Sequence, residues 1–113
     1  MATSSNPRVL DLDSLDRETV EPGYQRDKFV TKVNDMEIAF TDPKELPWDV
    51  VVTMDQTPRR FFSTAIEDPE QRRHMLQIEG EKALKLWKLQ YLMEQYRNHF
   101  GIDAEGNAVG SRR

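Results

Sequence analysis

Apolar and polar residues alternate along residues 27–40, "DKFVTKVNDMEIAF", which is a pattern typical of β-strands. Asn34 and Asp35 divide this stretch in the middle, and both residue types tolerate the positive φ angles that a two-residue hairpin turn requires. The stretch therefore predicts a β-hairpin in which Phe29 faces Phe40. Its mostly apolar face would carry Phe29, Thr31, Val33, Met36, Ile38 and Phe40. Because an isolated hairpin is marginally stable, we expect this face to pack on helices.

Proline follows a favourable helix N-cap residue three times, at Asp42-Pro43, Thr57-Pro58 and Asp68-Pro69. Proline fits the first helical position because no hydrogen-bonded N–H is needed there. These sites predict a short helix over about 43–54, a second over about 58–66, and a longer helical segment over about 69–100. Pro47 lies close to the start of the first helix, and only a first turn accommodates proline without breaking the helix.

The long third segment contains one glycine before its end. Gly80 either interrupts the helix or allows close packing, and from residue 81 the helical pattern continues to Gly101. Gly101 stands where a C-terminal glycine cap belongs. Apolar residues spaced three or four apart predict the inward face: Leu86, Leu89, Met93, Tyr96 and Phe100.

A second apolar group lies on a different side of the same predicted helix from this inward face, at Ala83, Leu84, Trp87 and Tyr91. A small domain seldom covers a helix on two sides. The group therefore either packs beneath the N-terminal arm or the first helix, or it forms a surface for a partner or for self-association. Trp and Tyr are favoured anchors of such surfaces. Leu84, Trp87 and Tyr91 are the candidate partner-binding or self-association residues.

These elements predict a mainly α fold of the α+β type, with an N-terminal β-hairpin packed on three to four helices and the C-terminal helix the longest. The hairpin and helices would form one domain over 27–101. Residues 1–26 would be a flexible acidic arm, or an arm whose "VLDLDSL" segment docks onto another surface, and 102–113 a polar tail. The predicted core consists of Phe29, Val33, Ile38, Phe40, Trp48, Phe61, Phe62, Leu86, Leu89, Met93, Tyr96 and Phe100.

Composition narrows the class of protein. The 113 residues suit one small domain. Their net charge is -4, and the sequence lacks the basic cluster that nucleic-acid binding requires. Disulfides and thiolate metal sites are excluded because there is no cysteine. No stretch has the length and hydrophobicity of a signal peptide or a membrane span. We therefore expect a soluble cytoplasmic protein that contacts neither nucleic acid nor membrane.

Catalytic and metal-binding patterns are missing from the sequence. His74 and His99 have no ligand spacing and are expected on the surface, and Ser63 and Thr64 have no companion base nearby. Neither a P-loop, a dinucleotide-binding glycine pattern nor a nucleophile elbow occurs. Four arginines predict a solvated basic edge or, alternatively, a contact for an acidic partner: Arg59, Arg60, Arg72 and Arg73. We expect no enzyme activity, cofactor or metal.

From about residue 27 to 110, the chain resembles the small tail assembly chaperones of long-tailed, siphovirus-type bacteriophages, especially those that infect actinobacteria. The order of elements carries this resemblance, together with "TDPKEL-W" in 41–48, "TPRRFF" in 57–62 and "L-x-x-L-M-x-x-Y-R-x-H-F-G" in 89–101. A tail with Gly and Asn, "GNAVGS", follows the last motif. None of these motifs is catalytic.

The resemblance implies a non-enzymatic chaperone that acts in the host cytoplasm during virion morphogenesis. It would bind the tape measure protein, keep it soluble, assist tail tube assembly through the tail tube protein, self-associate as a homo-oligomer, and be absent from the mature virion. Two other classes stay open. One is a structural virion component, such as a head–tail completion protein, and the other is a small regulatory binding module whose acidic arm folds on a partner.

Overall fold

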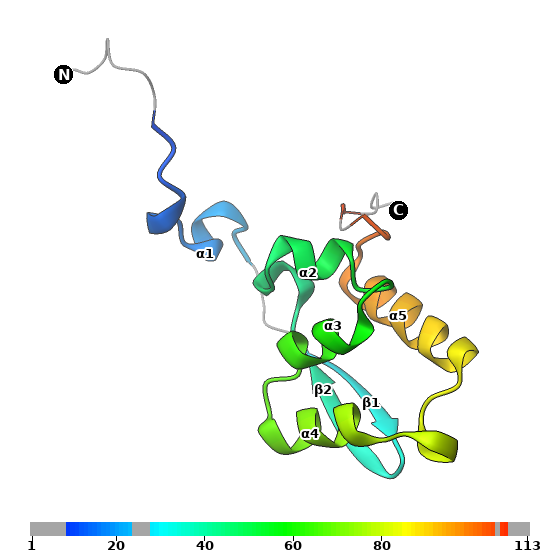
Figure 1. Cartoon of the computed structure of the whole chain (residues 1–113). Coiled ribbons are helices and arrows are strands. Elements are labelled where there is room, and N and C mark those ends of the chain that lie inside the picture. Colours follow the sequence, from blue (N-terminus) through cyan, green and yellow to red (C-terminus); the bar gives the residue numbers. More distant parts are fainter. Residues whose placement is uncertain (1–8, 24–27, 106, 109–113) are drawn as a thin grey trace, which may run out of the picture.

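A two-stranded antiparallel hairpin lies against several helices, and the longest helix is at the C-terminal end of the fold (Figure 1). The structure is a computed structural model that describes residues 9–23, 28–105 and 107–108. The elements are η1 (Leu12–Ser14), α1 (Arg17–Val20), β1 (Phe29–Val33), β2 (Met36–Phe40), η2 (Pro43–Glu45), α2 (Trp48–Val52), α3 (Pro58–Ala65), α4 (Pro69–Gln77), η3 (Gly80–Lys82) and α5 (Leu86–Phe100). The predicted fold class is confirmed.

The hairpin turn consists of Asn34 and Asp35, whose φ angles are 49° and 69°. Both central residues of a type I′ turn need positive φ, and this turn matches the twist of the flanking strands. The predicted register is confirmed, with the pairs Phe29–Phe40, Val30–Ala39, Thr31–Ile38, Lys32–Glu37 and Val33–Met36. As a consequence, Val33, Ile38 and Phe40 are buried on the face that meets the helices.

The three proline-marked helix starts are each preceded by the expected N-cap residue: Asp42, Thr57 and Asp68. The side chain of Asp68 accepts a hydrogen bond from the N–H of Glu70 at 2.8 Å, and Asp42 caps η2 in the same way. Thr57 makes no such bond, because its hydroxyl donates instead to the carbonyl of Thr53. Two of the three starts are therefore held by side-chain caps.

Replacing Asp68 with alanine is expected to lower the free energy of unfolding by about 1 kcal/mol, the usual cost of losing an N-cap acceptor. Asp68→Asn is the matched control, because asparagine keeps an oxygen acceptor and should retain most of the stability. Urea denaturation followed by circular dichroism measures both variants. Equal stability of wild type and Asp68→Ala would contradict the capping role.

The helix predicted over 43–54 is wrong as a single element, since the chain forms η2 and then α2 with a break at Leu46 and Pro47. Pro47 has ψ 139°, and Leu46 before it is also extended, with ψ 159°. A residue that precedes proline is sterically disfavoured in the helical region, so the break follows from local sequence. Trp48 thereby becomes the first residue of α2 and is 77% exposed, so its predicted place in the core is wrong.

The helix predicted to run unbroken from 81 is also wrong at its start, because α5 begins only at Leu86. Gly80 takes φ 64°, a left-handed conformation that glycine adopts without steric cost, and the chain then crosses to α5 through η3. The side chain of Asn34 donates a hydrogen bond to the carbonyl of Lys82 at 2.8 Å. This bond ties the connection to the hairpin turn and fixes a non-helical path.

Two predicted residues change position as a result. Leu84 lies in the connection rather than on α5, and it is partly buried against the core. Leu86, the first residue of α5, is 68% exposed, so its predicted place in the core is wrong. Among the described residues, the later residues Met93 and Tyr96 on the inward side of α5 are buried, whereas the first turn of the helix is left exposed at Leu86.

An aromatic cluster forms the centre of the core, where β2, α3 and α5 meet. The rings of Phe40 and Phe61 are stacked with centroids 5.7 Å apart, and Tyr96 lies edge-on to both. The hydroxyl of Tyr96 donates to the backbone carbonyl of Thr41 at 2.6 Å, which satisfies a buried polar group. Of the predicted core, Val33, Ile38, Phe40, Phe61, Phe62, Met93 and Tyr96 are buried, and Phe29, Leu89 and Phe100 pack against them half-buried.

Gly101 ends α5 with φ 70° and donates its N–H to the carbonyls of Arg97 and Asn98, which confirms the predicted glycine cap. Ile102 then donates to the carbonyl of Arg97 at 3.0 Å and is buried. The first residue after the cap therefore belongs to the packed body. It also contributes to the surface described next.

Candidate partner-binding surfaces

Three large apolar residues of α5 are exposed, and we call them the α5 outer face: Leu86, which lies in the first turn on the side of Leu89 and Met93, and Trp87 and Tyr91, which lie on another side. Trp87 and Tyr91 are 62% and 60% exposed. Their spacing of four residues places the two rings next to each other on the helix surface. Met93 and Tyr96 of the same helix are buried in the core, so α5 has an inward side and a separate exposed aromatic side.

The start of α5 is electrically positive. Lys82, Lys85 and Lys88 are the only charged residues between 82 and 93, and all three are exposed. The ammonium of Lys88 lies 5.6 Å from the centre of the Trp87 ring, within cation–π range. The first turn of α5 has no acidic residue, so nothing offsets the positive end of the helix dipole there. This surface combines apolar area with positive charge.

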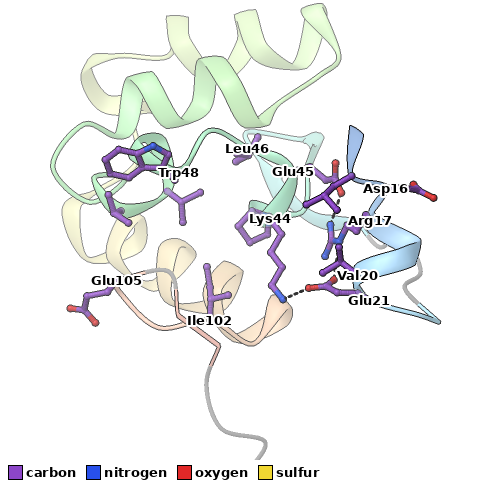
Figure 2. Close-up of a pocket in the computed structure, with 14 residues that line it drawn as sticks. Asp16, Arg17, Val20, Glu21, Lys44, Glu45, Leu46, Trp48, Ile102 and Glu105 are labelled. Carbon is purple, nitrogen blue, oxygen red and sulfur yellow. Dashed lines mark hydrogen bonds and ion pairs between the residues drawn. The ribbon is translucent and has the colours of Figure 1, made fainter. Parts of the chain in front are cut away.

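A groove of about 560 Å³ lies on another side of the molecule, between α1, the η2–α2 region and the segment after α5. Figure 2 shows Trp48 and Ile102 along it and Val20 of α1 at its far side. We call it the Trp48 groove. Its lining comprises Leu15, Asp16, Arg17, Val20, Glu21, Pro43, Lys44, Glu45, Leu46, Trp48, Val51, Val52, Ile102 and Glu105.

Ion pairs join α1 to the η2 side of this groove. Arg17 pairs with Asp42 at 3.0 Å. Figure 2 shows Arg17 beside Glu45, with which it also pairs, and Lys44 paired with Glu21 at 2.9 Å. The hydrogen bond from Lys44, with a second from Arg17, holds the pKa of the Glu21 carboxyl below its usual value. Arg17 and Lys44 beside the groove are therefore already paired with carboxylates of the same chain.

Of the arginines predicted to form a solvated basic edge, Arg59, Arg60 and Arg73 are exposed and Arg72 is half-buried, and three of the four also bond to other parts of the fold. Arg59 donates to the carbonyl of Leu76 at 2.8 Å, and Arg72 donates to the carbonyl of Ile66 at 2.9 Å. Arg60 pairs with Asp49, and this contact lowers the pKa of the Asp49 carboxyl. These three side chains help to hold neighbouring elements together.

His74, His99, Ser63 and Thr64, which were considered as candidate functional residues, all make contacts within the fold. Nε2 of His74 lies 2.9 Å from the carbonyl oxygen of Val33, and the exposed His99 packs its ring against Phe29. The hydroxyls of Ser63 and Thr64 donate to carbonyls one helical turn earlier. Across the described ranges, no group of three or more His, Cys, Asp or Glu side chains is arranged to hold a metal.

The structure brings together two of the three candidate partner-binding residues. Trp87 and Tyr91 share one exposed surface, whereas Leu84 is separated from them in the connection before α5. Sequence reasoning missed Leu86 and Trp48 as exposed apolar residues. For Trp48, the proline directly before it was a usable signal, because a break there makes Trp48 a helix-start residue rather than an interior one.

Comparison of the chain with protein-family models, curated proteins and solved structures finds no match. None of the helices formed by the described residues has both the length and the apolar character needed to cross a bilayer. The two exposed apolar surfaces must therefore be interpreted from their own chemistry.

Proposed function

We propose that this chain is a tail assembly chaperone of a long-tailed bacteriophage. It is a non-enzymatic protein of the host cytoplasm that binds the tape measure protein, keeps it soluble and assists assembly of the tail tube, and it self-associates. The observation that carries this proposal is the α5 outer face, where Leu86, Trp87 and Tyr91 are all more than half exposed. The resemblance of 27–110 to such chaperones supplies the identity of the partner.

The chemistry of this face suits a long, helical, apolar partner. An amphipathic helix binds another protein by laying its apolar side against exposed apolar residues spaced along a helix or groove. Trp87 and Tyr91 provide two adjacent rings for such a contact, and each aromatic side chain can bury roughly 150–250 Å². The inward side of α5 is packed on the aromatic core through Tyr96, so the helix that carries Trp87 and Tyr91 is held in place by the fold.

A Trp87→Ala, Tyr91→Ala double variant is expected to lose the tape measure protein. Truncating an interface anchor costs about 2 kcal/mol or more, which weakens binding roughly 30-fold. The measurement is co-expression with the tape measure protein, scored as the fraction of that protein that stays soluble and is pulled down. Circular dichroism establishes that the variant is folded.

Val30→Ala is the matched control, because Val30 is also an exposed apolar residue but lies on the outer side of the hairpin. This variant should bind as wild type does. Normal pull-down by the folded double variant would contradict the assignment of the α5 outer face. Mass spectrometry of purified virions supplies a second test, since a chaperone should be missing from them and a structural component should be present.

A further inference from the structure

The arm segment, which we define as residues 9–16, exposes both apolar and acidic side chains. Its four large apolar residues range from 47% to 85% exposed: Val9, Leu10, Leu12 and Leu15. Asp11, Asp13 and Asp16 give the segment a formal charge of -3, with no basic residue among 9–16. Among the described residues, none of these three carboxylates forms an ion pair. The segment therefore has the composition of a ligand for an apolar surface with positive charge.

Within one molecule, ion pairs hold the arm segment away from the α5 outer face. Arg17 and Glu21, which follow the segment directly, are tied by ion pairs to Asp42, Lys44 and Glu45 beside the Trp48 groove. Figure 1 shows α1 on one side of the body and the start of α5 on the opposite side. While these ion pairs hold, the segment stays away from the α5 outer face of the same molecule.

The α5 outer face has the complementary chemistry. The ammonium of Lys88 lies 5.6 Å from the centre of the exposed Trp87 ring, and Lys82 and Lys85 precede these residues in the chain, so that residues 82–93 carry a formal charge of +3 with no acid. None of these ammonium groups forms an ion pair with a described residue. The Trp48 groove differs, because Arg17 and Lys44 are already neutralised there. Opposite charges on the two surfaces favour the α5 outer face as the site for the arm segment.

We infer that the arm segment of one copy binds the α5 outer face of a second copy. The contact joins two different surfaces, so it is a head-to-tail contact that either closes into a ring or continues as an open array. A segment of eight residues makes a small interface, and the charges are exposed, so association should be weak and should decline as salt screens them.

This inference deepens the proposed function, on which it rests for the role of the α5 outer face as a binding surface. The arm segment would cover Trp87 until the tape measure protein displaces it. Self-association and partner binding would then compete for one site. The chaperone would keep its own apolar face out of water before its partner is made.

Two full-length charge-reversal variants test the inference. The arm variant is Asp13→Lys, Asp16→Lys, and the face variant is Lys85→Glu, Lys88→Glu. Sedimentation of the wild type at low salt should show concentration-dependent association that weakens in high salt. Each variant alone should associate at least tenfold more weakly, because its arm and its α5 outer face then repel.

Mixing the two variants in equal amounts should restore association. The face variant keeps an intact arm, the arm variant keeps an intact α5 outer face, and these two intact halves can meet between copies. A wild type that is monomeric at all concentrations, variants that associate as wild type does, or a mixture without recovery would each overturn the inference. Circular dichroism of both variants shows whether loss of association reflects unfolding, and recovery in the mixture is possible only for folded halves.

Failure of this inference can be told apart from failure of the proposed function. The arm variant retains Trp87 and Tyr91, so it should still keep the tape measure protein soluble in co-expression. If it does so while associating as wild type does, the arm contact is wrong and the chaperone function stands. If charge reversal behaves as expected but the Trp87→Ala, Tyr91→Ala variant still solubilises the tape measure protein, the α5 outer face serves self-association alone.

Discussion

Replacing Phe40 with alanine is expected to lower the free energy of unfolding by about 3–5 kcal/mol, the usual cost of truncating a buried phenylalanine. Phe40 is fully buried, and its ring contacts those of Phe61, Phe62 and Tyr96, from α3 and α5. Alanine would leave a cavity at the junction of the hairpin and the helices. Small domains are stable by about 5–15 kcal/mol in total, so this loss removes a large part of the stability. Urea denaturation followed by circular dichroism measures the change.

Val30→Ala provides the control for this prediction within the same hairpin. Val30 is 53% exposed on the side that faces away from the helices, so its truncation should change the free energy of unfolding by no more than about 0.5 kcal/mol. A cost below about 1 kcal/mol for Phe40→Ala would mean that the hairpin does not pack on the helices as described.

Alkaline pH is expected to destabilise the protein through Tyr96. Burial of the phenol, with a smaller contribution from the charge of Asp42, raises the pKa of Tyr96 well above its ordinary value. The folded state therefore keeps its proton at pH values where the unfolded state loses it. This stability is fully present below the unfolded-state pKa of about 10 and is lost as pH rises above it, by about 1.4 kcal/mol per pH unit.

Denaturation at a series of pH values for wild type and Tyr96→Phe tests this second prediction. The variant should be less stable near neutral pH by about 1 kcal/mol, because the carbonyl of Thr41 loses its hydrogen-bond donor. Above pH 10, its stability should fall less steeply than that of the wild type. Tyr91→Phe is the control, since Tyr91 is exposed and should leave the pH dependence unchanged. Parallel pH profiles for wild type and Tyr96→Phe would contradict the buried, neutral phenol.

The predicted features that are confirmed are those set by a few neighbouring residues. Asn34 and Asp35 permit the positive φ angles of one turn type, and that turn fixes which strand residues pair. Asp68 with its following proline starts a helix, and Gly101 ends one, through hydrogen bonds that span a single turn. Such features need no knowledge of the rest of the chain.

The candidate surface could be predicted only in part. Helical spacing placed Trp87 and Tyr91 away from the buried seam, and both are exposed on one side of α5. The same spacing wrongly added Leu84, because a helical pattern does not show where the helix begins. The connection that carries Leu84 is fixed by Gly80 and by the hydrogen bond from Asn34, which is distant in sequence.

By itself, the sequence determined the hairpin and its register, the glycine cap and most of the core, because local backbone preferences and apolar periodicity act over a few residues. The proline before Trp48 marks the break that makes it a helix-start residue, but the exposure of Trp48 and Leu86 was decided by the tertiary structure. Both are large apolar residues in periodic patterns, and such patterns mark a side of a helix without showing whether another element covers it. Burial is a property of the assembled elements, so it was decided by where α2 and the first turn of α5 lie relative to the hairpin.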